Sequence, residues 1–209
     1  MGCVVVWVRV PAELNLGTEH GLGQTMRLAT LVLGERRRQG TLRREAVTDP
    51  LTRLGNRAAL RQRLDDATGP VTVALLDLDD FKPVNDTYGH DTGDAVLRAV
   101  ADRLAATVRG DDLVTRFGGD EFAVVFADGT PPEGVAASTE RIQAALARPV
   151  ATDRSVNGGV NGGPVVTVGV SIGVATGAPA EVVGRADAAL YEVKRSKQLV
   201  PPRPGTAGA

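Results

Sequence analysis

Residues 112–126 read Asp-Leu-Val-Thr-Arg-Phe-Gly-Gly-Asp-Glu-Phe-Ala-Val-Val-Phe and set the topology expected for the whole chain. Two strand-like runs, 112–117 and 120–126, flank the pair Gly118-Gly119. Two glycines between two apolar runs are typical of a tight β-hairpin turn. The segment therefore predicts two antiparallel strands joined by a two-residue turn.

The elements on either side of this hairpin alternate between strand and helix. Residues 71–78 form a continuous apolar run that ends in carboxylates, which indicates a buried central strand. The apolar spacing predicts helices at 57–66, 92–108, 134–148 and 180–196, and a Val-rich strand at 165–175. Asp49-Pro50 is expected to start a further helix, and the residues around His90 to lie in a loop. The order β-α-β-β-α-β predicts an α+β, ferredoxin-like, palm-type antiparallel sheet flanked by helices, with an additional C-terminal helix.

This topology brings two acidic strand ends together. Right-handed crossovers place the 71–78 strand antiparallel to the returning arm of the hairpin. Like charges about 4 Å apart repel by about 4 kcal/mol at an effective dielectric near 20, so a cation would stabilise the cluster. Carboxylates suit Mg²⁺ or Mn²⁺, with Asp77 and Asp120 as the expected pair, while Asp79 and Asp80 have the alternative interpretation of solvated loop charges. The acidic residues at the two ends are Asp77, Asp79, Asp80, Asp120 and Glu121.

Two features point to a phosphate ligand at the same edge. Gly118-Gly119 carries no side chains, so a ligand can approach the backbone closely. The chain has only three lysines, Lys82, Lys194 and Lys197, and all are expected near the acidic edge. Lysine is a flexible point charge suited to phosphates, although surface lysines are also common.

Composition limits the other classes of protein. The 209 residues carry a formal net charge of −1, which argues against a protein that coats a nucleic acid polymer. One cysteine excludes an intramolecular disulfide, and two histidines exclude a multi-histidine zinc site. No stretch has the roughly 20 apolar residues of a membrane span, so a cytoplasmic protein is expected. Residues 1–47 are expected to form a partly helical arm, either a dimerising element or a linker, and residues 48–198 the main folded domain. Residues 199–209 are expected to be a disordered tail, and residues 157–163 a flexible loop.

Five ordered blocks of the chain resemble the GGDEF family, the diguanylate cyclases. Gly118-Gly119-Asp120-Glu121-Phe122 is the family signature. The resemblance covers roughly residues 48–198, and its other blocks are residues 49–57, 77–94, 171–175 and 186–191.

The resemblance implies that two GTP molecules are joined into cyclic di-GMP with release of two pyrophosphates. Each subunit would bind one GTP, so two subunits must face each other in a homodimer. Asp77, Asp120 and the Leu78 carbonyl would hold the metals, two Mg²⁺ or Mn²⁺ per half-site. By the same resemblance, Asp120 would act as general base, and Glu121 would assist with the metal or with the attacking hydroxyl. Asn85 and Asp94 would recognise guanine, and Lys82 and Lys194 would contact the triphosphate. His90 would contact either the nucleotide or its own loop.

Two further features concern phosphate affinity and regulation. Gln198 stands where the family commonly has a second basic residue, and Lys197, one position earlier, is a candidate substitute. Arg109 and Asp112 match the family's RxxD site, where the product would bind and inhibit, with Arg141 in support. The alternative for this group is a surface ion pair of little energetic consequence.

Two other functions remain open on sequence alone. One is a non-catalytic module that binds GTP or cyclic di-GMP and signals by binding. The other is a mononucleotide cyclase on a related palm-like fold, which the dimer-family motifs disfavour. The input signal is not encoded in any recognisable sensor segment.

Overall fold

The computed structural model describes residues 46–152 and 163–199. The arm expected over residues 1–47, the loop at 157–163 and the tail after 199 lie almost entirely outside the described residues. No helix within the described part of the chain is long and apolar enough to cross a bilayer.

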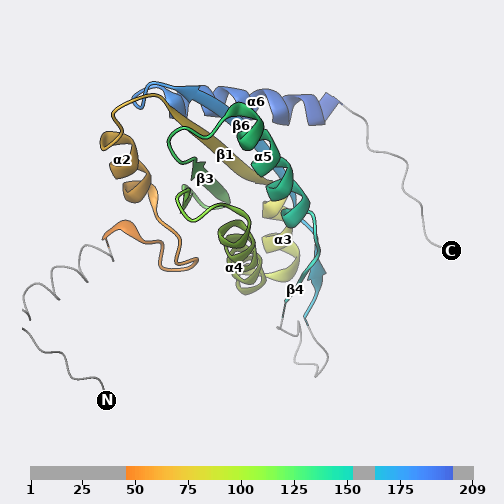
Figure 1. The fold of residues 1–209 in the computed structure, drawn as a ribbon. Coiled ribbons are helices and arrows are strands. Elements are labelled where there is room, and N and C mark those ends of the chain that lie inside the picture. Colours follow the sequence, from red (N-terminus) through yellow and green to blue (C-terminus); the bar gives the residue numbers. More distant parts are fainter. Residues whose placement is uncertain (1–45, 153–162, 200–209) are drawn as a thin grey trace, which may run out of the picture. The chain divides into compact units, whose positions relative to one another are not determined.

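A four-stranded antiparallel sheet forms the centre of residues 46–199 (Figure 1). Its order is β2-β3-β1-β6, which confirms the predicted ferredoxin-like topology. A separate two-stranded ladder pairs β4 with β5. The strands are β1 Val71–Asp79, β2 Leu113–Arg116, β3 Glu121–Val125, β4 Val150–Ala151, β5 Val165–Val166 and β6 Gly169–Gly177.

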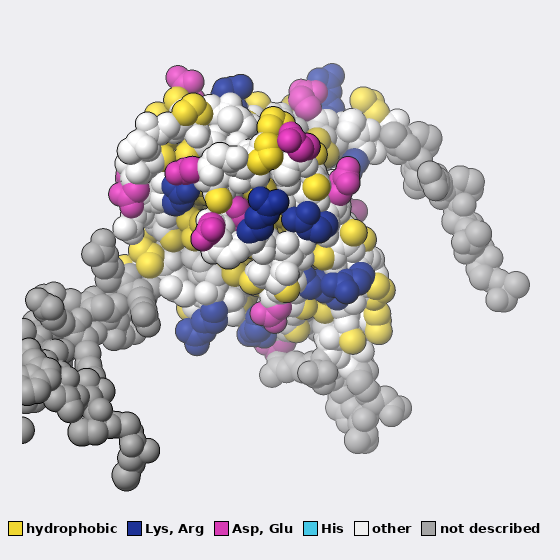
Figure 2. All heavy atoms as spheres, viewed as in Figure 1, with side chains coloured by type: hydrophobic (Ala, Val, Ile, Leu, Met, Phe, Trp, Pro, Cys, Tyr) yellow, Lys and Arg dark blue, Asp and Glu magenta, His cyan; other side chains and the backbone are white. Residues whose placement is uncertain are grey.

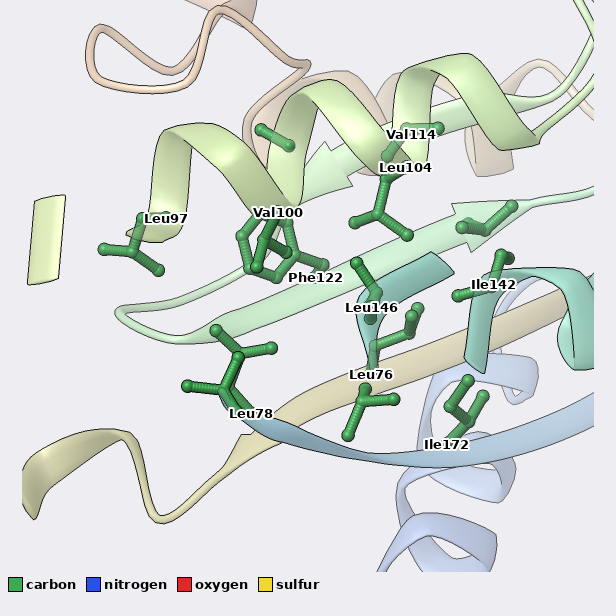
Figure 3. Packing of buried hydrophobic residues seen from close by; sticks show 14 of the residues in the cluster. Leu76, Leu78, Leu97, Val100, Leu104, Val114, Phe122, Ile142, Leu146 and Ile172 are labelled. Carbon is green, nitrogen blue, oxygen red and sulfur yellow. The ribbon is translucent and has the colours of Figure 1, made fainter. Parts of the chain in front are cut away.

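Helices cover both faces of the sheet because alternate residues of β1 are apolar on each side. Leu76 and Leu78 face the layer built by α4 (His90–Thr107) and α5 (Pro132–Leu146) (Figure 3). Val73 and Leu75 pack on the other face, against α6 (Val182–Leu199) and α2 (Arg57–Asp65). With both faces covered, the ends of the strands are where polar side chains can gather.

The hairpin connection is longer than predicted. Arg116 pairs with Phe122, and the backbone N–H groups of Phe117 and Gly118 both donate to Glu121 O. The two-residue turn is therefore wrong, because residues 117–120 form a four-residue connection. The Arg116 guanidinium donates to Gly119 O through Nε at 3.1 Å and Nη2 at 2.6 Å, which holds this wider loop.

Three other local predictions are corrected. The loop expected around His90 is instead helical, because helix α3 (Phe81–Tyr88) precedes it and α4 begins at His90, with only Gly89 at a φ of 82° between them. No helix begins at Asp49-Pro50, because Asp49 N donates to Leu54 O and closes a turn that includes Arg53 at a φ of 63°. The single strand expected at 165–175 is divided between β5 and β6.

Candidate active site

The acidic ends of β1 and β3 lie side by side, as predicted. Asp77 is directly opposite Glu121 in the antiparallel register, and Leu78 N donates to Asp120 O at 3.3 Å. Strand pairing, rather than loop conformation, therefore fixes the separation of these groups. The backbone of β1 ends here and turns sharply at Asp80, which has a φ of 56°.

Two lysines of α6 contact the carboxylates of β1. Lys194 Nζ lies 2.6 Å from Asp77 Oδ2, and Lys197 Nζ lies 2.6 Å from Asp79 Oδ2. A pocket of about 400 Å³ opens at this point. Its lining residues are Asp77, Asp79, Asp80, Lys194, Lys197 and Gln198.

The electrostatics of this edge favour a cation. Burial raises the pKa of Glu121 above its ordinary value, and repulsion from Asp77 and Asp120 raises it further, while Lys194 acts in the opposite direction. A side chain at Gly118 would collide with the Glu121 carboxylate, so this glycine leaves room for it.

The donor set fits a hard divalent cation. Oxygen ligands suit Mg²⁺, which commonly takes one or two carboxylates and completes its shell with water and phosphate. Within residues 46–152 and 163–199, no group of three or more His, Cys, Asp or Glu side chains is placed to hold a metal ion. The carboxylates at this edge are oxygen donors of the kind that a hard divalent cation prefers.

A second pocket of about 300 Å³ lies between the hairpin connection and the helix pair α3–α4. The close approach of these helices depends on Gly93, where a Cβ would collide with Asn85 Oδ1. The pocket brings together six of the predicted site residues, namely Lys82, Asn85, His90, Asp94, Gly119 and Asp120. Phe81, Leu97 and Arg116 complete its lining.

Sequence reasoning missed Arg116 as a residue of this site. Besides its bonds to Gly119 O, Arg116 Nη1 lies 3.4 Å from Asp49 Oδ1. Burial alone would raise the pKa of Asp49, but hydrogen bonds from Thr52 and the Arg116 charge hold it below its ordinary value. The position of Arg116, at the end of β2 just before the glycine pair, was the available signal.

The three residues predicted to bind the product, Arg109, Asp112 and Arg141, are not among the lining residues of either pocket. Asp112 Oδ2 accepts from the backbone N of Arg109 at 3.0 Å, and its Oδ1 accepts from Ala127 N at 2.8 Å. Arg141 Nη2 donates to Ser138 Oγ at 2.8 Å on α5.

On the face of the molecule shown in Figure 2, basic and acidic side chains are interspersed.

Residues 46–199 match the family model for the diguanylate cyclase GGDEF domain. The chain belongs to this family. The GGDEF match includes every described residue of the two pockets.

Curated GGDEF relatives and solved structures agree with this assignment. The chain is 38% identical over 163 residues to the response regulator PleD of Caulobacter vibrioides, covering 72% of this chain and 34% of PleD. It is 36% identical over 198 residues to the probable diguanylate cyclase DgcC of Escherichia coli, covering 91% of this chain and 51% of DgcC. The chain thus spans about a third to a half of the length of these two relatives.

One solved structure is similar over most of its length. The coiled coil and GGDEF domain of DgcB from Caulobacter crescentus, in complex with c-di-GMP, has a TM-score of 0.71 and 33% identity. The match covers 83% of this chain and 94% of the DgcB chain.

Proposed function

We propose that this chain is a diguanylate cyclase that joins two GTP molecules into cyclic di-GMP. The observation that carries the proposal is the presence of two pockets near the edge where β1 ends and β3 begins. One is lined by carboxylates of β1 and lysines of α6, and the other by Asn85, Asp94 and Asp120 together with Lys82. This division suits a nucleotide, whose triphosphate and base need different chemistry.

The acidic edge would hold the triphosphate with its cation. Asp77, Asp120 and the Leu78 carbonyl are the proposed ligands of Mg²⁺ or Mn²⁺, two per half-site. The cation would supply charge neutralisation at the phosphates. Lys194 and Lys82 supply positive charge from α6 and α3, and Gly118 and Gly119 allow the phosphates to approach the hairpin backbone.

The smaller pocket would select guanine. Asp94 accepts hydrogen bonds from the ring N–H and the exocyclic amine, and Asn85 bonds the same edge. An adenine presents an acceptor where guanine presents the ring donor, so a carboxylate at this position disfavours it. His90 lines the same pocket and is a further contact for the nucleotide.

The reaction requires two copies of the site. The 3′ oxygen of one GTP forms a bond to the α-phosphorus of the other, and the bond to pyrophosphate breaks. The hydroxyl proton passes to a carboxylate at the edge, with Asp120 as the proposed base and Glu121 in support. The same step in the opposite direction closes the ring, so a homodimer that aligns the two nucleotides supplies most of the acceleration.

The group Arg109, Asp112 and Arg141 is proposed to bind the dinucleotide product and to slow the enzyme. Two arginines suit phosphates, since a guanidinium binds them in a bidentate manner.

Product identification tests the proposed activity. The full chain is incubated with GTP and Mg²⁺ beside the Asp120→Asn variant, and products are identified by mass spectrometry. Cyclic di-GMP from the native chain alone is expected. If GTP binds but no product forms at high protein concentration, a non-catalytic binding module is the better description.

A further inference from the structure

Lys197, in the last turn of α6, contacts strands β1 and β6 of the sheet. Its ammonium donates to Asp79 Oδ2 at 2.6 Å and to Val170 O at 2.8 Å. Lys197 follows Lys194 by three residues, so both project from the same side of the helix. The two lysines therefore contact β1 as parallel pairs, one with Asp77 and one with Asp79.

Strand β6 is built to accept this contact. Ser171, which is fully buried, donates through Oγ to Asp79 Oδ1 at 2.6 Å. Gly169 is directly opposite Asp79 in the β1–β6 register. A Cβ at position 169 would lie 2.7 Å from Asp79 Oδ2, the oxygen that Lys197 contacts. Ser171 of β6 thus supplies a hydrogen-bond donor, and Gly169 of β6 leaves the space that the Asp79 carboxylate occupies.

We propose that Lys197, Asp79, Ser171 and Gly169 form a latch that positions Lys194 over Asp77. Each Asp79 oxygen accepts a hydrogen bond from this chain, so both oxygens belong to the latch. Asp77, the proposed cation ligand, is paired with Lys194 through Oδ2. Lys197 acts through Lys194 and is a positioning residue. Its consequence for GTP binding rests on the proposed function, whereas the latch itself does not.

The latch would restrict the motion of the C-terminal end of α6, where Lys194 lies. Lys194 stands five residues before the end of α6 at Leu199, and helix ends fray. A lysine side chain also loses considerable rotamer freedom when it is held in one position. Fixing the last turn lowers the entropy that the helix must lose when Lys194 engages a ligand.

Hydrogen exchange on the full chain without nucleotide tests the latch directly. Lys197→Met and Gly169→Ala are expected to speed exchange of the amides at 197–199 by about three- to tenfold, since an exposed ion pair contributes modestly. Lys197→Arg should restore protection. The matched control is Arg195→Met, which removes an equal charge from an exposed position on the same helix and should change nothing. Unaltered exchange in Lys197→Met would overturn the latch.

A double-mutant cycle separates positioning from direct phosphate contact. The probe is guanosine 5′-[α,β-methylene]triphosphate with Mg²⁺, and affinity is measured by calorimetry. Lys197→Met should weaken binding about three- to tenfold in the native background, and have little further effect once Lys194 is methionine. Additive losses would overturn the positioning role and make Lys197 a phosphate ligand itself. If the native chain does not bind the probe, the proposed function fails while hydrogen exchange still decides the latch.

Discussion

Asp77 and Glu121 face each other directly across the β1–β3 ladder, so two carboxylates of like charge occupy one cross-strand pair. Like charges at such a position destabilise a sheet. Burial, with the added repulsion of Asp77 and Asp120, raises the pKa of Glu121. The fold therefore carries an electrostatic cost at the edge where the proposed chemistry occurs.

This cost gives the stability of the chain a specific dependence on pH. Because the pKa of Glu121 in the folded chain is above its ordinary value of 4.5, the folded state holds its proton more tightly. The stabilising effect of this bound proton is complete at pH values below the pKa of Glu121 in the unfolded chain. It is lost as the pH rises through the pKa of Glu121 in the folded chain. Glu121→Gln should remove this loss and raise the melting temperature near neutral pH by roughly 2 °C.

Thermal unfolding of the native chain and of Glu121→Gln from pH 4 to 8 tests this prediction. Added Mg²⁺ should reduce the difference between their melting temperatures by stabilising the native chain. A variant that melts lower than the native chain near neutral pH would contradict this account, since it would show that the charged Glu121 stabilises the fold.

Guanine selection should depend on Asp94. The native chain is expected to prefer GTP over ITP, which lacks the exocyclic amine. Asp94→Asn should lower kcat/KM for GTP by about 10- to 100-fold and reduce that preference, because a hydrogen bond to a charged acceptor is lost. Arg98→Ala is the control, since Arg98 lies 3.9 Å from Asp94 in an exposed pair and should matter little. An unchanged GTP/ITP ratio in Asp94→Asn would place base selection elsewhere.

Product inhibition should depend on the Arg109 guanidinium. Arg109→Ala is expected to raise the cyclic di-GMP concentration for half inhibition about tenfold or more, because a charged phosphate contact is removed. Arg109 is the better target than Asp112, whose carboxylate also binds the backbone N–H groups of Arg109 and Ala127. Progress curves with added product give the answer, with Arg195→Met as the charge control. Equal inhibition in all three proteins would remove the product site from this group.

Two glycines offer a matched test of the packing of α6 on β6. A Cβ at Gly173 would collide with the backbone of α6 at Ala186 and Leu190, whereas one at Gly184 meets nothing within 4 Å. Gly173→Ala should cost about 1–3 kcal/mol in the free energy of unfolding, as overpacked sites do. Gly184→Ala, in the first turn of α6, should be stabilising by up to about 1 kcal/mol, because alanine has a higher helix propensity than glycine. Urea unfolding of both variants measures the contrast, and equal effects would contradict the close helix–strand contact.

The sheet and its acidic edge could be predicted from the sequence because residues 71–78 are a continuous apolar run that ends in carboxylates. The structure buries β1 on both faces, with Leu76 in one core and Leu75 in the other. Helix α3 could not be predicted in the same way. It contains Pro83, Asn85 and Thr87, which are poor helix formers, and its only buried residues are Phe81 and Val84. Tertiary packing, rather than local preference, therefore specifies this helix.

Contacts between segments that are distant in the sequence could not be predicted either. Asp49 and Arg116 are 67 residues apart, and no local pattern connects them. The pairing of Lys194 with Asp77 depends on the angle at which α6 crosses β1. The sequence placed both residues at the acidic edge, but in separate roles, as a phosphate contact and a metal ligand.

Product stoichiometry is the most direct test of the proposed activity. Native protein is incubated with GTP and Mg²⁺, and consumed GTP, released pyrophosphate and each guanine nucleotide are measured over time. We expect one cyclic di-GMP and two pyrophosphates for every two GTP consumed. Pyrophosphate accompanied by cyclic GMP, with no cyclic di-GMP, would contradict the account and favour a mononucleotide cyclase.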